Sequence, residues 1–342
     1  MTVLPSLQTF CYNKPFPLES GQMLPALQIG YHTYGQLNDA GDNVLWICHA
    51  LTANSNVADW WSGLTGDGKV WDSQKYFIVC ANILGSCYGS SGPLSDNPVT
   101  GKPYYSHFPL VTIRDMVKAH ILLRRYLGVK KIALLAGGSM GGYQVLEWIL
   151  AEPEKIERSF LITTGASESA WGISIHAAQR LAIEADSTWC NDSPEAGKNG
   201  MKAARAIGML TYRNYQTFVN RQTDPDVNKI DNFKASSYIV YQGEKLVKRF
   251  NAQSYWLLTK AMDSHNIARN RAETTAEVLK TIQQKTLIIG ITSDILCPAE
   301  EQRFLARNMP QAAYYEIDSP YGHDGFLIEF ERIGKILQDW MR

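Results

Sequence analysis

The sequence predicts an α/β fold with a mostly parallel, doubly wound sheet and a helical cap inserted above it. Short apolar runs of strand length alternate with segments of helical spacing along most of the 342 residues. One run, at residues 132–136, leads through a glycine turn into a helix. Residues 168–270 interrupt the alternation with helical pieces between polar turns. We therefore expect a core of residues 1–167 and 271–342, with residues 168–270 as the cap.

The predicted elements follow in chain order. Residues 24–34 alternate apolar and polar side chains between Gly21 and Gly35, which is typical of an antiparallel edge hairpin. Residues 44–48 and 76–81 are apolar runs suited to central strands that are covered on both faces. The remaining elements are predicted from the same patterns: helices at 113–127, from Gly142 onward, at 299–308 and at 326–341, and strands at 159–163, 286–291 and 313–317.

Composition narrows the function classes. Lysine plus arginine and aspartate plus glutamate both number 33, so no net charge attracts nucleic acid or an acidic membrane surface. With 45% hydrophobic residues the chain has material for a large core. The expected partners are small molecules, with no nucleic acid and no membrane.

The sequence favours the cytoplasm. Residues 1–6 lack a basic start and a long apolar segment, and no later stretch reaches the roughly twenty apolar residues of a membrane span. Six cysteines without framework spacing are expected to be buried free thiols in a reducing compartment; they are at positions 11, 48, 80, 87, 190 and 297.

Residues 137–141, Gly-Gly-Ser-Met-Gly, match the pattern G-x-S-x-G between a predicted strand and a predicted helix. In that context the serine lies at a strained corner with its hydroxyl exposed above the sheet. Ser139 is therefore the candidate nucleophile. The alternative is a packing turn with an incidental serine.

A serine nucleophile needs a histidine base, and the histidine needs a carboxylate that fixes its tautomer. Asp294 follows the predicted strand 286–291, and His323 precedes the last predicted helix. This gives the chain order Ser, Asp, His that G-x-S-x-G proteins of this fold class show. The alternatives are a helix N-cap for Asp294 and an ordinary loop residue for His323.

Two backbone amides are candidates for an oxyanion hole: that of Met140, after the nucleophile, and that of Leu51, in the loop after strand 44–48. An ordinary strand-to-helix turn is the alternative for this loop.

The glycine-rich run 85–92 lacks the Gly-Lys-Ser/Thr ending of a phosphate loop, so we expect a backbone wall beside the active site. No metal-ligand motif is present in the sequence, and no metal is expected.

With these residues in place, the chain resembles the homoserine O-acetyltransferases, acyltransferases with the α/β-hydrolase fold in methionine biosynthesis. Eight segments carry the resemblance: residues 31–35, 49–52, 82–93, 108–109, 112–117, 137–142, 293–296 and 321–324. The resemblance implies the triad Ser139, Asp294 and His323, with Leu51 and Met140 as oxyanion donors. It also implies acetyl-CoA as co-substrate, no bound cofactor, and a homodimer that associates through its caps.

The resemblance adds an amino-acid clamp. Arg205 corresponds to the residue that holds the homoserine carboxylate, with Tyr212 supporting it, and Asp324 corresponds to the residue that receives the amino group. A zwitterion requires such a cationic fork and a separate carboxylate. The alternatives are that Arg205 decorates a cap helix and that Asp324 caps the last helix. The aromatic-rich stretch from 238–241 to 250–256 is a candidate for the dimer contact. The alternative is that the same residues pack in the core.

Some positions depart from the family. Ala53 stands where glycine is frequent in the family, residues 189–192 lack a usual glycine-tyrosine pattern, and Asn266 stands after His265 where an acidic residue is frequent.

The expected reaction is a ping-pong transfer of acetyl through an acyl-serine to the hydroxyl of L-homoserine. Succinyl-CoA as donor, L-serine as acceptor, a serine esterase or thioesterase, and a non-enzymatic binding protein remain alternatives.

Overall fold

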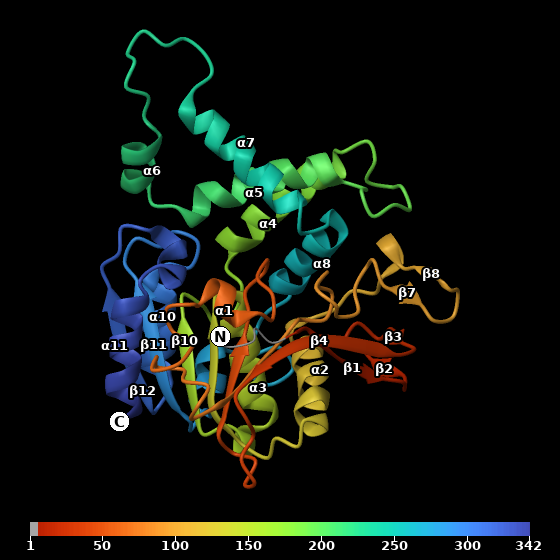
Figure 1. The fold of residues 1–342 in the computed structure, drawn as a ribbon, viewed down its shortest axis with the longest axis vertical. Coiled ribbons are helices and arrows are strands. Elements are labelled where there is room, and N and C mark those ends of the chain that lie inside the picture. The colour runs from red at the N-terminus through yellow and green to blue at the C-terminus, as the bar shows by residue number, and fades with distance from the viewer. Residues whose placement is uncertain (1–5) are drawn as a thin grey trace.

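A computed structural model of the protein describes residues 6–342, and its centre is an eight-stranded sheet (Figure 1). Strand β4 pairs antiparallel with β1 and β6, and all other neighbours are parallel. The α/β fold class is thus confirmed. In spatial order the strands are β1 (Gln8–Tyr12), β4 (Leu27–Tyr34), β6 (Phe77–Ala81), β5 (Val44–Cys48), β9 (Ile132–Gly138), β10 (Arg158–Ile162), β11 (Lys285–Ile291) and β12 (Ala312–Ile317).

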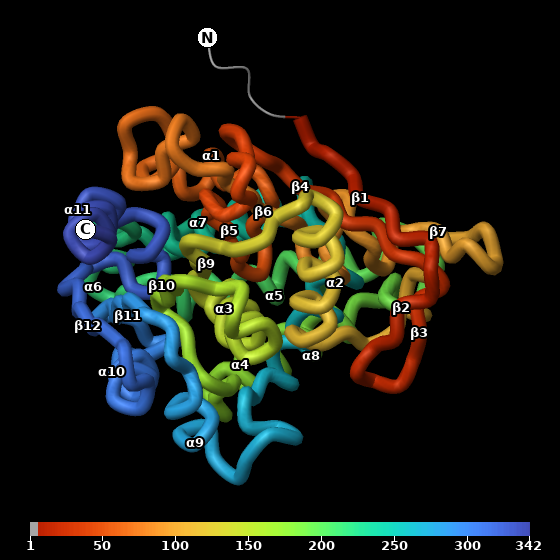
Figure 2. The backbone as a smooth tube through the Cα atoms, turned by 90° about the horizontal axis from the view of Figure 1, so that it is seen from below, coloured from red at the N-terminus to blue at the C-terminus, as the bar shows by residue number. Residues whose placement is uncertain are grey.

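Helices cover both faces of this sheet. Figure 2 shows α3 (Met140–Ala151) and α10 (Ala299–Asn308) on one side of the strands, and α1 (Val57–Trp60) and α11 (Phe330–Met341) on the other. Strand β5 shows why: Val44 and Trp46 belong to one apolar cluster, whereas Leu45 and Ile47 belong to another. Because side chains alternate along a strand, a continuous apolar run requires cover on both faces.

The remaining elements are the helix α2 and several short helices, strand pairs and turns. They are α2 (Ile113–Tyr126), which packs beside α3, α9 (Thr275–Leu279), the paired strands β2 (Phe16–Pro17) with β3 (Met23–Leu24) and β7 (Asp96–Asn97) with β8 (Lys102–Pro103), and three 3-10 turns, η1 (Tyr105–His107), η2 (Pro153–Lys155) and η3 (Gly322–Leu327).

Two predicted elements are wrong in detail. Residues 24–34 are not an edge hairpin, because β4 lies between β6 and β1, and β1 occupies the edge. The predicted helix 326–341 begins only at Phe330, since residues 322–327 form the turn η3. In η3 the carbonyl of Phe326 accepts a hydrogen bond from the buried indole of Trp61 at 2.9 Å, which fixes this turn against α1.

Six helices lie between β10 and β11 in the chain, and Figure 1 shows five of them, all but α9, together above the sheet. These helices lie at the end of the sheet where Ser139 follows β9. Residues of α4 and α5 line the same cavity as that serine. The cap limits 168 and 270 stay predictions. The five helices are α4 (Ala170–Glu184), α5 (Lys198–Tyr212), α6 (Tyr215–Gln222), α7 (Lys234–Val247) and α8 (Ala252–Asp263).

The stretch proposed as a dimer contact does not form one surface. Val240 and Tyr241 on α7 are 57% and 55% exposed, whereas Phe250 and Tyr255 are 5% and 0% exposed and belong to the main apolar cluster. Core packing therefore accounts for the second half of the stretch. The homodimer itself stays a prediction.

None of the six cysteines forms a disulfide; Cys48, Cys80 and Cys297 are buried, whereas Cys11 and Cys190 are exposed. The expectation of buried thiols thus holds for only part of the set. Within residues 6–342 no helix has the length and apolarity needed to cross a membrane. The predicted lack of a secretory signal concerns residues 1–6, of which 1–5 lie outside the described residues.

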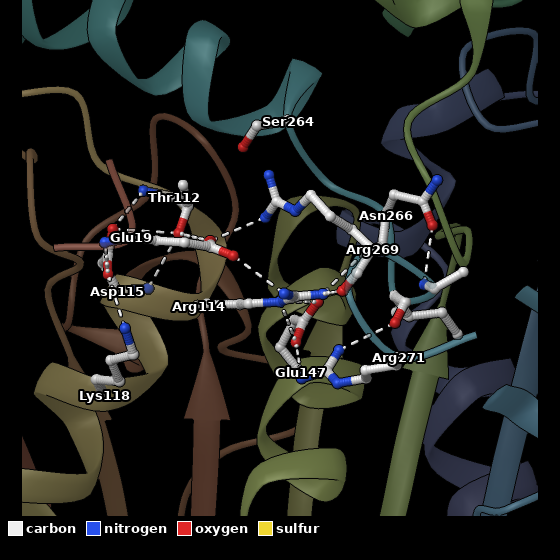
Figure 3. Close-up of polar contacts among 12 residues, drawn as sticks. Glu19, Thr112, Arg114, Asp115, Lys118, Glu147, Ser264, Asn266, Arg269 and Arg271 are labelled. Atoms are coloured by element: carbon white, nitrogen blue, oxygen red, sulfur yellow. Dashed lines mark hydrogen bonds and ion pairs between the residues drawn. The ribbon is translucent and has the colours of Figure 1, made fainter. Parts of the chain in front are cut away.

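An ion network around the buried Glu147 fastens the chain after α8 to the core (Figure 3). Arg114 on α2 donates from Nε to both carboxylate oxygens of Glu147 at 3.1 Å and from Nη1 to Glu19 at 3.0 Å. Its Nη2 donates to the carbonyls of Asn266 and Arg269. Glu147 is 2% exposed, and a buried carboxylate requires such partners. One side chain thus joins α2, α3 and the chain leaving the cap.

Arg114→Met is expected to lower the free energy of unfolding by about 3 kcal/mol, because it removes one of the two arginines that face buried Glu147. The matched control is Lys118→Met on the same helix, whose lysine is half exposed and pairs with Asp115. That variant should cost less than about 1 kcal/mol. Denaturant unfolding measures both, and equal losses would show that the network does not stabilise the fold.

Candidate active site

Ser139 lies at a tight turn between β9 and α3, with φ +54° and ψ −129°. A residue other than glycine rarely adopts this backbone conformation, which costs about 1–3 kcal/mol. The turn also needs glycine on both sides: a Cβ on Gly137 would lie 2.3 Å from the carbonyl oxygen of Gly141, and one on Gly141 would lie 2.2 Å from that of Cys48. The spacing of the motif thus follows from the close approach of α3 to β5 and β9.

The structure brings Ser139, His323 and Asp294 together although they are far apart in sequence. The Nε2 atom of His323 lies 3.0 Å from the Ser139 hydroxyl, and Nδ1 lies 2.7 Å from Oδ2 of Asp294. Since an ionised carboxylate only accepts, Nδ1 carries the proton and Nε2 accepts from the serine. All three are buried. The arrangement can therefore deprotonate the hydroxyl as an acyl group is attacked.

Asp294 is held by the backbone that follows it. Its Oδ1 accepts hydrogen bonds from the amides of Leu296 and Cys297 at 2.8 and 2.9 Å, which leaves Oδ2 for the histidine. The alternative of a helix cap is wrong, because the N-cap of α10 is Pro298.

Charge around His323 favours its protonated form. Burial lowers its pKa, but the Asp294 carboxylate outweighs this through charge and hydrogen bonding, with Asp324 and Glu168 adding to the effect, so the pKa lies above the usual 6.5. A base must be neutral to accept a proton, so acylation is expected to fall as pH decreases through this raised pKa.

Asp324→Asn removes one of the carboxylates that raise the pKa of His323. We therefore expect the acid limb of kcat/KM for acylation of Ser139 to move to lower pH, measured with a chromogenic acetyl ester and no acceptor. Asp339→Asn, at an exposed position on α11, is the control and should leave the profile in place. An unshifted profile in Asp324→Asn would contradict the electrostatic account.

The loop after β5 is fixed beside Ser139 by His49. Its Nδ1 donates to the carbonyl of Ala50 at 2.9 Å, and its Nε2 accepts from the amide of Ile83 at 3.1 Å. Burial lowers the pKa of His49 to about 4, so the ring is neutral and can serve as both donor and acceptor. The side chain of Gln144 on α3 donates to the carbonyl of His49 at 3.0 Å. This loop therefore has a defined position relative to the nucleophile.

Two amides near Ser139 are available to a ligand. Met140 is the first residue of α3, where the N–H has no partner within the helix. Among the turn and loop hydrogen bonds of residues 6–342, none uses the amide of Leu51. Leu51 and Ser139 line one cavity of about 320 Å³. The geometry is thus compatible with the oxyanion role, which stays a proposal.

The same cavity contains the three clamp residues predicted on the cap and on η3, namely Arg205, Tyr212 and Asp324. The guanidinium of Arg205 lies 5.2 Å from the ring centre of Tyr212, and its buried Nε has no hydrogen-bond partner among residues 6–342. Asp324 is not a helix cap, since Glu329 precedes α11. Arg205 lines the cavity, and its role as a clamp residue stays a proposal.

Sequence reasoning gave no role to Arg213, yet its Nη1 lies 3.0 Å from Oδ2 of Asp324. It also missed Glu168 and Glu301 behind the triad. Glu168 accepts from the hydroxyl of Tyr143 at 3.1 Å. Burial, Glu168 and Asp294 raise the pKa of Glu301 to about 7. Single acidic residues and arginines have no distinguishing sequence signal, so only the fold reveals these neighbours.

One expectation is wrong: residues 85–92 do not line the cavity. This run packs beneath α8, where a Cβ on Gly85 would contact the side chains of Leu257 and Leu258 at 3.1 and 3.3 Å. Its link to the site is indirect, because the Tyr88 hydroxyl accepts a hydrogen bond from Arg249, which does line the cavity.

Among residues 6–342, one group of side chains could offer ligands to a metal: Asp294, Cys297 and His323, whose donor atoms lie within 4.8 Å of one another. Both oxygens of Asp294 already accept hydrogen bonds. Burial raises the pKa of the Cys297 thiol well above its usual value, and a thiol is a poor ligand. The donor set fits a triad better than a metal, and the absence of a metal stays a prediction.

Comparisons with known proteins agree with this geometry. The alpha/beta hydrolase fold family model matches residues 43–330. A homoserine O-acetyltransferase of Cyclobacterium marinum is 49% identical over 340 residues, which cover 99% of this chain and 96% of that protein.

Two solved structures share the fold. The homoserine O-acetyltransferase from Bacillus anthracis has a TM-score of 0.92 at 23% identity and covers 100% of this chain and 98% of its own. Esterase E22 has a TM-score of 0.91 at 22% identity, with 99% and 100% covered. At such identities these two structures support the fold alone. From the sequence relatives, the chain belongs to the homoserine O-acetyltransferase family of α/β-hydrolase-fold proteins.

Proposed function

We propose that this protein is a homoserine O-acetyltransferase of methionine biosynthesis, which moves acetyl from acetyl-CoA to the side-chain hydroxyl of L-homoserine. One observation carries the proposal. A preformed serine, histidine and aspartate triad lies in a cavity that also holds an arginine and a separate carboxylate, in a chain 49% identical to a protein of that name.

In the first half-reaction Ser139 attacks the thioester carbonyl while its proton passes to Nε2 of His323. The negative charge on the carbonyl oxygen is received by the amides of Leu51 and Met140. Collapse of this intermediate breaks the carbon–sulfur bond, and the histidine returns the proton to the leaving thiolate. The products are acetyl-Ser139 and free CoA.

In the second half-reaction the acceptor's amino-acid group is held at two points. Arg205 pairs with the carboxylate of L-homoserine, and its unpartnered Nε is consistent with a missing anionic partner. Asp324 uses Oδ2 for Arg213, which leaves Oδ1 for the ammonium group. His323 then takes the proton of the side-chain hydroxyl, which attacks the acetyl group and releases Ser139 with its proton restored.

Water must lose the competition for the acetyl group. Positioning of a bound alcohol supplies several kcal/mol over a freely diffusing competitor, and the cap helices α4, α5 and α8 contribute residues to the cavity wall. A homodimer, which the family resemblance implies, and a cytoplasmic location, which the sequence favours, are part of the same proposal.

The main rival is hydrolysis, because esterase E22 has the same fold with a TM-score of 0.91. The deciding experiment measures CoA release from acetyl-CoA and from succinyl-CoA, with L-homoserine, with L-serine and without acceptor. Release that requires homoserine and prefers acetyl-CoA supports the proposal. Equal release without acceptor would make the protein a hydrolase, and preference for another donor or acceptor would change the substrates.

Arg205→Gln separates transfer from hydrolysis by the triad. Removing the guanidinium should raise KM for homoserine by at least about tenfold, whereas acylation of Ser139 by a chromogenic acetyl ester should be retained. If Arg205→Gln matches the unaltered protein in transfer to homoserine as well as in acylation of Ser139, the clamp role of Arg205 is wrong.

A further inference from the structure

A basic rim lies beside the catalytic cavity, formed by Arg205 on α5, Lys245 in the last turn of α7, and Arg249 just after α7. These three side chains, with Gln242 and Leu246, line a second cavity of about 90 Å³. Arg205 and Arg249 also line the cavity of Ser139, so the two cavities adjoin. The rim is therefore next to the catalytic chamber.

The rim comes from one face of α7. Gln242, Lys245, Leu246 and Arg249 are spaced i, i+3, i+4 and i+7, which places them along one side of a helix. That side faces α5, against which α7 packs. Glu244 lies elsewhere on the helix, lining a separate hollow with Phe233 and Tyr241.

The positive charge of the rim has no counterion in the described part of the chain. Within residues 6–342, Arg205, Lys245 and Arg249 form no ion pair within 4.0 Å. The hydrogen-bond partners of the Arg249 side chain, the carbonyl of Thr52 and the hydroxyl of Tyr88, are neutral. By contrast, the exposed Arg303 pairs with both Glu300 and Glu316. Several uncompensated cations at the edge of a cavity suit a ligand with several negative charges.

We propose that Lys245 and Arg249 bind the phosphate groups at the nucleotide end of the acyl-CoA donor, while its thioester reaches Ser139. This inference rests on the proposed function. The donor is a long molecule with a neutral arm and an anionic nucleotide. Apolar side chains such as Ile175, Met262 and Leu296 line the cavity of Ser139 and suit the arm. Lys245 and Arg249 line the adjoining smaller cavity, where the nucleotide would lie.

A structural role is the main alternative for Lys245, because a cation in the last turn of a helix interacts favourably with the helix dipole. Lys248, the C-cap residue of α7, would serve that role equally. Lys248 lines neither of the two cavities. The two lysines therefore form a matched pair, in which only Lys245 is placed to contact the donor.

The test compares Lys245→Gln with Lys248→Gln in the full-length protein. We expect Lys245→Gln to raise KM for acetyl-CoA about five- to tenfold, with KM for acetyl-pantetheine, which lacks the nucleotide, and for homoserine unchanged. Calorimetric binding of adenosine 3′,5′-bisphosphate should weaken by a similar factor and depend on salt in the unaltered protein. Lys248→Gln should match the unaltered protein in each measurement.

The outcomes separate this inference from the proposed function. If the unaltered protein turns over acetyl-CoA with homoserine but Lys245→Gln does not selectively raise KM for acetyl-CoA, the inference is overturned and the proposed function stands. The same loss with acetyl-pantetheine as with acetyl-CoA, or an equal loss in Lys248→Gln, also overturns it. If the unaltered protein does not turn over acetyl-CoA, the proposed function fails. The calorimetry then still decides the inference, since absence of adenosine 3′,5′-bisphosphate binding contradicts it.

Discussion

Ser139→Ala is expected to reduce kcat/KM for acyl transfer by about 10⁵-fold, because it removes the hydroxyl that forms the acyl intermediate. His323 and Asp294 remain in place in the variant, but Nε2 of His323 has no hydroxyl to deprotonate. Incubation with acetyl-CoA followed by intact-mass measurement should show an acetylated unaltered protein and an unmodified variant.

A paired substitution tests the strained turn at the same residue. Alanine keeps the cost of φ +54°, so the free energy of unfolding should hardly change. Ser139→Gly removes that cost and should raise the free energy of unfolding by about 1 kcal/mol, while being as inactive as alanine. Retention of more than a hundredth of the activity by either variant would contradict the role of Ser139. Equal stability of the two would contradict the strain.

Asp294→Asn is expected to lower kcat/KM by about 10³- to 10⁴-fold. The oxygen of the asparagine can still accept from the amides of Leu296 and Cys297, so the loop should keep its shape. The amide nitrogen then faces Nδ1 of His323 and donates to it, which puts the ring proton on Nε2. In that tautomer the ring cannot accept the proton of Ser139.

The measurements for Asp294→Asn are transfer kinetics across pH and denaturant unfolding. Loss of the carboxylate should also lower the pKa of His323, because Asp294 is the main group that raises it. Unfolding should be little changed. A variant with near-normal turnover would show that another group orients the histidine. Asp324 and Glu168, which also raise the pKa of His323, are the further acids that the structure suggests.

Sequence predicted most of the scaffold because apolar periodicity reports burial directly. Residues 44–48 match β5 and residues 299–308 match α10. The short β1 at the sheet edge was not predicted: only one of its five residues is buried, so its sequence carries little apolar pattern. The last helix was placed too early because apolar Phe326 belongs to η3 and packs against Trp61 rather than continuing α11.

For the site, sequence motifs nominated the members of the triad because local chemistry marks them: glycines around Ser139, and positions after strands for Asp294 and His323. The relations between distant residues had no such signal. The ion pair of Asp324 with Arg213 and the basic rim at Lys245 depend on how α5, α7 and η3 meet. The packing of residues 85–92 beneath α8 depends on contacts between distant segments in the same way.

By itself, then, the sequence determined the α/β class, the strained serine turn and the order of the catalytic residues, since each depends on neighbouring residues and on periodic burial. Only the tertiary structure decided which strand forms the edge, which charges remain without partners and which side chains share the cavity of Ser139. Those properties depend on the packing of segments that are far apart in the chain, and on desolvation and charge at sites that no single segment contains.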